Sequence, residues 1–394
     1  MKKLTILALH LGYGGIEKCI SEVSNLLSND FNIEILSIYK LYGKEVYKFN
    51  NNIKITYLTN IKPNRYEFIS YLKQFRLIKA FKEGLKSIKI LHIKKKVIVN
   101  ALKNANSDIV ISTNIFLNKL LGKYSNCKLK IAWEHNHYQK TVNYANKFMN
   151  SCKNINKAIL VSKDIYNYYS NLFDNNNIKC KCVYIPNFID NKFAIKSSLL
   201  NKNIISVGRL SKEKGFSDLI DVFKLINEKD DSIKLTLVGD GSEYNNIKNK
   251  IKEYKLENNI NMTGYLNSDQ IDKLYEESSI YLMTSYTESF GLVLIEAMSH
   301  GVVPVAFNSA QGSKEIIENN YNGYLISNRD KEEMASITVD LLNNKNKLKE
   351  LSNNTYLKVM EYSSDKVYNK WVELLKGDNI WKKGFYLYHQ WVVI

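Results

Sequence analysis

The chain has 394 residues, and its 56 Lys and Arg outnumber its 39 Asp and Glu, which gives a formal net charge of +17 at pH 7. Apolar residues make up 45% of the sequence and aromatic residues 12%, so the chain can bury sizeable cores and is not a disordered protein. The length favours two domains, and no apolar run approaches the roughly 18 residues that indicate a transmembrane helix.

Two features of the chain predict a cytoplasmic location. The apolar residues 4–9 imitate a signal peptide, but Gly14 and Gly15 follow where a small-residue cleavage site should lie. The cysteines are odd in number and lack the pairing of a zinc site, which favours a reducing compartment; they are Cys19, Cys127, Cys152, Cys180 and Cys182. The positive charge is spread along the chain and predicts general attraction to anions, without indicating a nucleic-acid site.

Short apolar runs alternate with longer amphipathic stretches from end to end. The expected strands cover residues 4–9, 33–38, 109–112, 130–133, 158–161, 204–207, 234–238, 259–263, 280–283 and 303–307. Apolar strands separated by helices indicate parallel sheets that are covered on both faces. We therefore predict an α/β protein with two doubly wound, Rossmann-like domains that face each other across a cleft. The boundary is expected near Pro186, with domains at 1–187 and 188–365, and with a helix returning to the first domain plus an aromatic tail at 366–394.

Polar residues that suit a phosphate follow the expected strands of the second half. Arg209 and Lys214 come after the strand at 204–207, where ligands bind in open α/β sheets. A planar guanidinium and a mobile ammonium are a complementary pair for a diphosphate, although either residue alone is more often a solvated loop cation. Gly239 and Tyr265 follow the next two strands, and each taken alone indicates an ordinary turn.

The strand at 280–283 leads to Glu288 and then to a helix that starts near Gly291 and contains Glu296. A helix N-terminus favours a phosphate, and Glu296 is suited to accept two hydrogen bonds from a ribose diol. Two carboxylates are also typical of a glycosidase acid/base pair. The cationic pair and the phosphate-suited helix start favour a nucleotide-linked ligand instead.

These motifs resemble those of the retaining glycosyltransferase family 4, and the resemblance covers residues 203–325. They are Gly208-Arg209, Lys214-Gly215, Gly239-Asp240-Gly241, Gly264-Tyr265 and the run from Glu288-Ser289-Phe290-Gly291 to Glu296-Ala297. The residues 311–317 resemble galactosyltransferase-like members that act on exopolysaccharide or capsule. The resemblance implies a GT-B fold, a UDP-sugar or other nucleotide-sugar donor held mainly by the second domain, and no need for a divalent metal or another cofactor.

The resemblance also implies the role of each residue. The diphosphate would be held by Arg209 and Lys214, and the ribose by Glu296, with Gly239 and Tyr265 as further donor-binding residues. Glu288 and His135 are expected to be catalytic. Glu288 and the backbones of Phe290, Gly291 and Leu292 would contact the sugar and the phosphate. The expected reaction is retaining transfer of a hexose or N-acetylhexosamine to a glycan or lipid-linked saccharide in surface polysaccharide biosynthesis.

In the first half, the resemblance places a glycine loop at Gly14 and Gly15 against the donor, and a sugar-contacting histidine at His135. Taken alone, the glycines would more often be a turn. His135 ends an expected strand within Trp133-Glu134-His135-Asn136-His137, so we expect it to face the cleft and to titrate near neutral pH. The spacing does not fit a metal site, and a structural histidine remains the alternative.

Residues 62–103 hold the one dense cluster of positive charge, in which cations repeatedly follow apolar residues. Such a stretch forms an amphipathic helix that either lies on an anionic membrane surface or packs on its own domain. We expect two helices, with breaks at Gly84 and near His92. A nucleic-acid partner ranks third because no recognised motif accompanies the charge. The aromatic tail at 378–394 is suited either to packing or to a membrane interface.

Two alternatives to a glycosyltransferase stay open at this point. One is a nucleotide-sugar epimerase of the same fold, which would need no acceptor. The other is a non-catalytic peripheral membrane adaptor that depends on residues 62–103.

Overall fold

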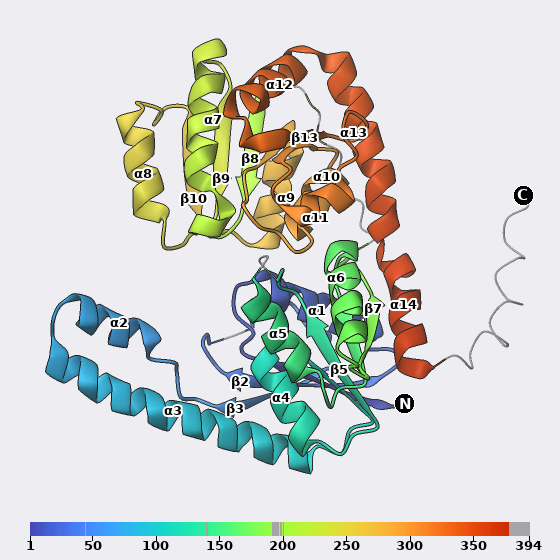
Figure 1. Ribbon diagram of the computed structural model, residues 1–394. Helices are drawn as coiled ribbons and strands as arrows, with labels where there is room; N and C mark the ends of the chain where they lie inside the picture. The colour runs from blue at the N-terminus through green and yellow to red at the C-terminus, as the bar shows by residue number, and fades with distance from the viewer. Residues whose placement is uncertain (44, 139–140, 191–196, 198, 200, 378–394) are drawn as a thin grey trace, which may run out of the picture. The chain divides into compact units, whose positions relative to one another are not determined.

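The structure is a computed structural model that describes residues 1–43, 45–138, 141–190, 197, 199 and 201–377. The chain divides into two compact units. Unit 1 comprises Met1–Val161, Tyr166–Ile185 and the segment from Trp371 onward, and unit 2 comprises Ser162–Ile165 and Pro186–Lys370. Each unit holds one parallel sheet with helices on both faces (Figure 1), so the prediction of two Rossmann-like α/β units is confirmed.

Unit 1 contains a seven-stranded parallel sheet in the order β3-β2-β1-β4-β5-β6-β7. The strands are β1 Lys3–Ala8, β2 Asn32–Tyr39, β3 Lys54–Thr59, β4 Ile109–Ser112, β5 Leu129–Glu134, β6 Lys157–Leu160 and β7 Lys181–Tyr184. The helices are α1 Gly15–Leu27, α2 Arg65–Lys73, α3 Leu77–Asn104, α4 Ile115–Tyr124, α5 Val142–Ser151 and α6 Lys163–Asn175. The central strands are apolar because both faces of the sheet are covered, and Ile6, Ile111 and Ile131 are fully buried.

Unit 2 contains a six-stranded parallel sheet in the order β10-β9-β8-β11-β12-β13. The strands are β8 Asn203–Val207, β9 Lys234–Val238, β10 Ile260–Gly264, β11 Ile280–Met283, β12 Val303–Phe307 and β13 Tyr324–Ile326. The helices are α7 Phe216–Lys229, α8 Tyr244–Glu253, α9 Ser268–Glu276, α10 Leu292–Ser299, α11 Gln311–Ile316, α12 Lys331–Asn343 and α13 Lys345–Val359, with 3-10 turns at Lys212–Lys214, Ser327–Arg329 and Met360–Tyr362. The last helix, α14 Ser364–Lys376, begins in unit 2 and passes into unit 1 at Trp371.

In both sheets the strand order reverses once, between β1 and β4 in unit 1 and between β8 and β11 in unit 2. Ligands of doubly wound sheets bind beyond the carboxyl ends of the strands at this reversal. The loops that follow β8 and β11 are therefore the ones that the topology of unit 2 places at its ligand-binding edge.

The basic stretch forms two helices, but the expected breaks at Gly84 and His92 are wrong. Helix α3 runs through both positions without interruption, and the chain turns earlier, at 74–76, where Phe75 has φ of +54°. A Cβ at Gly84 would lie 3.4 Å from the ring of Phe68 on α2, which is an ordinary van der Waals distance.

The last helix, α14, places Trp371 in the core of unit 1. Trp371 is 1% exposed and meets the ring of Trp133 edge-on at 5.0 Å between centroids. The aromatic tail at 378–394 lies outside the described residues. Within the part of the chain that the structure describes, no helix combines the length and the apolar character that crossing a membrane requires.

Candidate active site

The loop after β8 carries the two predicted cations. Arg209 directly follows the Gly208 turn, and its side chain is 69% exposed, with Nη2 at 3.7 Å from Glu213 Oε1. Lys214 lies at the end of the 3-10 turn, and its side chain is only 24% exposed. Arg209 is therefore the more exposed and more weakly paired of the two cations, whereas Lys214 packs against the protein.

Lys214 pairs with Glu288 across the reversal point of the sheet. Its Nζ donates to Glu288 Oε1, and the carboxylate side chain is 12% exposed. The same oxygen accepts a hydrogen bond of 3.2 Å from Ser285 Oγ. The structure thus brings together a predicted phosphate ligand and a predicted sugar ligand from loops that are far apart in the sequence.

The two loops are also joined through their backbones. Thr284 Oγ1 donates to the carbonyl of Gly215 at 2.9 Å, and the Tyr286 amide donates to the Glu213 carbonyl at 2.9 Å. Gly215 has φ of +66°, and a Cβ there would lie 2.1 Å from the carbonyl oxygen of Thr284. Only glycine allows this approach, so Gly215 fixes the position of Lys214.

Arg329, which the sequence reasoning missed, clamps the loop that follows β11. Its Nη1 donates to the carbonyl of Ser285 at 3.2 Å, and its Nη2 donates to the carbonyl of Thr284 at 2.8 Å. Nη2 also pairs with Asp218 Oδ2 at 2.5 Å, and the guanidinium lies 3.8 Å from the centroid of the Tyr286 ring. Nothing in the local sequence marks this residue, because its partners come from β12, α7 and the loop after β11.

Asp218, the acid of this clamp, is strongly ionised. Burial opposes its ionisation, but hydrogen bonds from Arg329, Lys331 and Tyr286 outweigh that effect and lower the pKa of Asp218 to about 2. The clamp therefore contains a carboxylate that keeps its charge throughout the physiological pH range.

The start of α10 has the geometry of an anion site. Gly291 precedes the helix with φ of +96°, and no side chain caps the first amides. The Phe290 side chain is 2% exposed and packs edge-on against Tyr362, so it has only its backbone to offer a ligand. On its other side the loop rests on Gly312, whose amide donates to the Glu288 carbonyl at 3.0 Å.

Glu296 lies on α10 and is partly exposed. Burial raises the pKa of Tyr281 on β11, and the negative charges of Glu288 and Glu296 raise it further. The two predicted carboxylates therefore lie near the same strand end.

Gly239 and Tyr265 lie at the ends of β9 and β10. Gly239 has φ of +135°, and a Cβ would lie 1.9 Å from the carbonyl oxygen of Gly208, so this glycine has a packing role in the structure. Its amide donates to the Gly264 carbonyl at 2.9 Å. Tyr265, directly after Gly264, is 52% exposed. Of the two, Tyr265 has the side-chain surface that a nucleoside needs.

In unit 1, His135 directly follows β5 and its ring packs on Trp133, with 4.3 Å between ring centroids. Among the described residues, its Nε2 is enclosed without a hydrogen-bond partner. Burial lowers the pKa of His135 to about 3. The expectation of titration near neutral pH is therefore wrong, because the enclosed imidazole stays neutral.

The neighbouring Glu134 is buried and shifted in the opposite direction. Burial raises the pKa of Glu134 to about 7, although Asn136 and Tyr144 donate hydrogen bonds to the carboxylate. The Asn136 amide donates to Oε1 at 2.7 Å. The group that titrates near neutral pH at the end of β5 is thus the carboxyl rather than the imidazole.

Gly14 and Gly15 lie at the start of α1, after the carboxyl end of β1. A Cβ on Gly14 would lie 2.1 Å from Glu17 Oε2, whereas a Cβ on Gly15 would meet nothing within 4 Å. The open space above Gly15 fits the approach of a ligand, while Gly14 also serves local packing.

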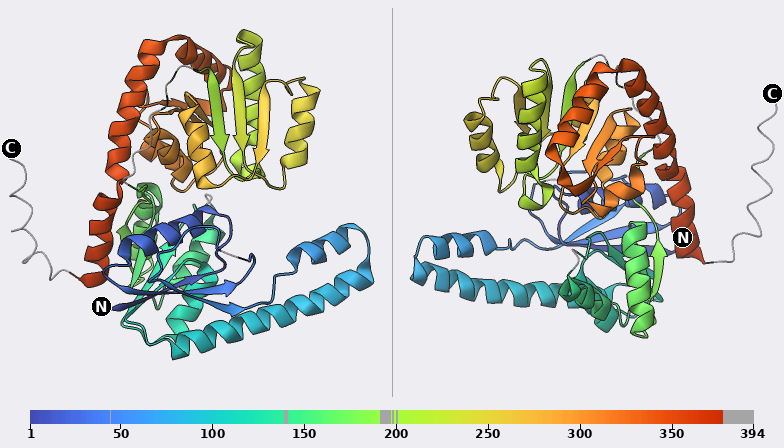
Figure 2. Two further views of the ribbon diagram at one scale, coloured as in Figure 1. Left: turned by 180° about the vertical axis from the view of Figure 1, so that it is seen from behind. Right: turned by 45° about the horizontal axis from the view of Figure 1, so that its top comes forward.

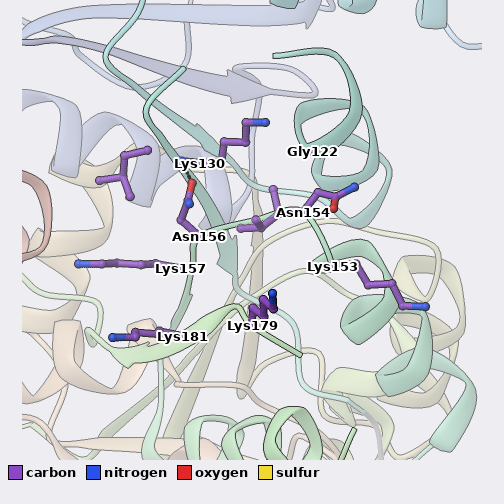
Figure 3. A pocket seen from close by; sticks show the side chains of 10 residues that line it. Gly122, Lys130, Lys153, Asn154, Asn156, Lys157, Lys179 and Lys181 are labelled. Atoms are coloured by element: carbon purple, nitrogen blue, oxygen red, sulfur yellow. Dashed lines mark hydrogen bonds between the residues drawn. The ribbon is translucent and has the colours of Figure 1, made fainter. Parts of the chain in front are cut away.

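A lysine-rich hollow of about 710 Å³ lies elsewhere in unit 1 (Figure 3), at the starts of β5, β6 and β7. Its lysines are Lys130, Lys153, Lys157, Lys179 and Lys181. Figure 3 shows Lys157 and Lys181 extending to one side and Lys153 to the other, so these side chains do not converge on one point. The hollow is at the amino ends of the strands and holds none of the predicted site residues.

Residues 188–358 match the family model for Glycosyl transferases group 1. An uncharacterized glycosyltransferase of Haemophilus influenzae is 28% identical over 383 residues, which cover 95% of this chain and 100% of that protein. The fold is GT-B, and the matches support a glycosyltransferase. The alternatives of an epimerase and of a non-catalytic adaptor are not favoured by these similarities.

Two further proteins are similar to this chain. The Campylobacter jejuni GalNAc-alpha-(1->4)-GalNAc-alpha-(1->3)-diNAcBac-PP-undecaprenol alpha-1,4-N-acetyl-D-galactosaminyltransferase is 23% identical, with 95% of this chain and 98% of that protein covered. A mutant of TarM from S. aureus, solved with fondaparinux, alpha-GlcNAc-glycerol and UDP, has the same fold. Its TM-score is 0.77 at 18% identity, and the match covers 96% of this chain and 100% of TarM.

Proposed function

We propose that the protein is a retaining, family 4-like glycosyltransferase that works in the cytoplasm in surface polysaccharide biosynthesis. It transfers a hexose or N-acetylhexosamine from a UDP-sugar to a glycan or lipid-linked saccharide. The observation that carries the proposal is the pair of Lys214 and Glu288, which lies at the strand reversal of unit 2 beside the uncapped start of α10.

The diphosphate of the donor is assigned to Arg209, Lys214 and the first amides of α10. When the bond between the anomeric carbon and the diphosphate breaks, negative charge develops on the leaving group. A fixed donor aimed at such charge is worth about 3 kcal/mol, and the helix start adds its partial positive charge. These groups supply the positive charge that a divalent metal supplies in other enzymes, so we expect transfer to continue in excess EDTA.

The base of the nucleotide is assigned to the β10 edge of the unit 2 sheet, which lies away from Glu288. Tyr265 follows β10, which is three strands away from β11 in the order β10-β9-β8-β11. At the usual strand spacing this distance is about 14 Å, which is comparable with the length of an extended nucleotide. The exposed Tyr265 ring and the turn at Gly239 would meet the base, and Glu296 would accept hydrogen bonds from the ribose.

The sugar is assigned to Glu288 and to the backbone around Phe290 and Leu292. An ionised carboxylate only accepts hydrogen bonds, which suits the hydroxyl groups of a hexose. The relative from Campylobacter jejuni is named for an α-linked product, and UDP-hexoses carry the sugar in the same configuration, which supports retention. The roles of His135, Gly14 and Gly15 as donor contacts remain predictions, with His135 acting as a neutral hydrogen-bonding group.

A panel of nucleotide sugars tests the proposal through thermal stabilisation. Any ligand that binds only the folded protein raises the melting temperature, so we expect one UDP-sugar, and UDP itself, to raise it. Lys214→Met should abolish most of this shift, whereas Lys224→Met, an exposed lysine on α7, should leave it unchanged. Absence of a shift with every nucleotide sugar would contradict the proposal. Incubation with the stabilising donor and an acceptor should then give a heavier acceptor.

A further inference from the structure

The helices α2 and α3 form a hairpin, residues 65–104, that carries an unusual exposed surface. Figure 1 and both views of Figure 2 show α2 and the first half of α3 extending away from the sheet of unit 1. Eight large apolar side chains of the hairpin are between 54% and 87% exposed: Tyr66, Phe75, Leu77, Ile78, Phe81, Leu85, Ile88 and Leu91. A solvated surface helix does not expose a continuous set of this kind.

The exposed apolar stripe of α3 points away from its own unit. At 100° per residue, Phe81, Leu85 and Ile88 fall within about 60° of one another around the helix. Ile90 and Ile98, which are 6% and 0% exposed, lie about 170° and 110° from the centre of that stripe. The apolar periodicity of α3 is therefore not explained by packing on its own domain, which uses another face.

A basic stripe runs beside the apolar one. Lys82, Lys86 and Lys89 are all exposed, and helical spacing places them next to Phe81, Leu85 and Ile88. Residues 62–103 contain 12 Lys and Arg against two Glu, so they carry +10 of the total charge of +17. Long lysine side chains can keep their ammonium groups in water while their stems lie along an apolar surface.

We propose that the hairpin docks on an anionic phospholipid bilayer. The apolar stripe of Phe81, Leu85 and Ile88 enters the boundary between head groups and acyl chains, and the lysine stripe binds the phosphates above it. An anionic bilayer complements the positive charge of the hairpin. A second copy of the chain would instead bring two strongly positive hairpins together. The inference goes beyond the sugar-transfer reaction and does not depend on it, since no donor is needed for docking.

Sedimentation with vesicles tests the proposal on the full chain. We expect the protein to bind vesicles of phosphatidylcholine mixed with phosphatidylglycerol, to bind pure phosphatidylcholine much less, and to be released by salt. The triple variant Phe81→Ser, Leu85→Ser, Ile88→Ser should bind at least about 100-fold more weakly, since each side chain contributes roughly tenfold when it is buried. Changing Lys82, Lys86 and Lys89 to Gln should weaken binding about fivefold for each lysine.

Two control variants separate docking from general attraction. Changing Lys153, Lys179 and Lys181 to Gln in the lysine-rich hollow removes the same charge from another surface of unit 1 and should reduce binding far less. Leu357→Ser removes an apolar side chain that is 60% exposed on α13 and should change nothing. Circular dichroism should show the triple Ser variant to be as helical as the wild type, because its three sites are exposed.

Three results would overturn the proposal. The first is wild-type affinity of the triple Ser variant for the anionic vesicles. The second is equal binding of the hollow variant and the Lys82, Lys86, Lys89 variant. The third is an oligomer in solution that the triple Ser variant disperses, because the stripe would then be covered by a second copy of the chain.

Discussion

Replacing Arg329 with Met removes the clamp on the loop that follows β11 while keeping a side chain of similar length. Four hydrogen-bonding interactions are lost: those to the carbonyls of Thr284 and Ser285, to Ser309 Oγ at 2.8 Å and to Asp218. Hydrogen bonds to charged groups are worth about 1.5–3 kcal/mol each. The Arg329 and Asp218 side chains are 19% and 16% exposed, and water can replace part of the loss. We therefore expect unit 2 to lose about 2–4 kcal/mol of stability.

The assay is urea denaturation at several pH values. The pKa of Asp218 is lowered from 3.8 to about 2 in the folded protein, so the network stabilises unit 2 fully above about pH 4 and loses this effect as the pH falls toward 2. That contribution is about 2 kcal/mol. The difference in free energy of unfolding between the wild type and Arg329→Met should therefore become smaller as the pH is lowered from about 4 toward 2.

Activity separates a positioning role from simple stability. Arg329 is assigned no contact with the donor, yet it holds Thr284 and Ser285 next to Glu288. We expect kcat/KM to fall in Arg329→Met at temperatures where the variant is fully folded, and Arg329→Lys to recover part of the stability but little of the activity, since Lys lacks the forked geometry. Two results would refute the reasoning. One is an Arg329→Met variant with the wild-type free energy of unfolding at pH 7, and the other is a stability difference from the wild type that stays constant down to pH 2.5.

Three other substitutions test single groups. Glu288→Gln should abolish transfer and leave the melting temperature within a few degrees of the wild type, and a wild-type turnover number would remove its catalytic role. His135→Ala should lower kcat severely, while the wild-type rate should show no titration of His135 between pH 5 and 8, because burial lowers its pKa to about 3; unchanged kinetics would make His135 structural. Glu134 has its pKa raised from 4.5 to about 7, so it destabilises the fold progressively as the pH rises through this range. In urea denaturation, the free energy of unfolding of Glu134→Gln should fall less with rising pH than that of the wild type. The same pH dependence in both proteins would contradict the raised pKa of Glu134.

The sequence was sufficient to locate the central strands. The runs expected at 109–112, 234–238, 280–283 and 303–307 coincide with β4, β9, β11 and β12. Strands β4, β11 and β12 are buried throughout, and β9 is buried at Leu235, Leu237 and Val238, so each reads as a mainly apolar run. The strands that were missed, β3, β7 and β13, lie at the edges of their sheets and are only partly buried. An edge strand mixes polar and apolar residues and resembles a loop in the sequence.

The site was predictable to the extent that it follows strand ends. Arg209, Lys214, Glu288 and Gly291 could be grouped because parallel strands bring their carboxyl ends to one edge. Arg329 could not be found, because its function comes from three-dimensional contacts with residues of other loops. The state of His135 was also hidden, since its pKa depends on enclosure against Trp133, which the local sequence does not reveal.

The pair of Lys214 and Glu288 links donor binding to transfer. The Lys214 ammonium donates to the Glu288 carboxylate, so a diphosphate must share Lys214 with Glu288 or displace Glu288 from it. Removing the charge of Glu288 leaves the ammonium available, and Glu288→Gln should therefore bind UDP at least as tightly as the wild type although transfer is lost. Lys214→Met should weaken UDP binding and also leave the carboxylate without its cation. Opposite effects of these two substitutions on UDP affinity would show that one ammonium serves both partners, whereas equal losses would mean that the pair only supports the loop.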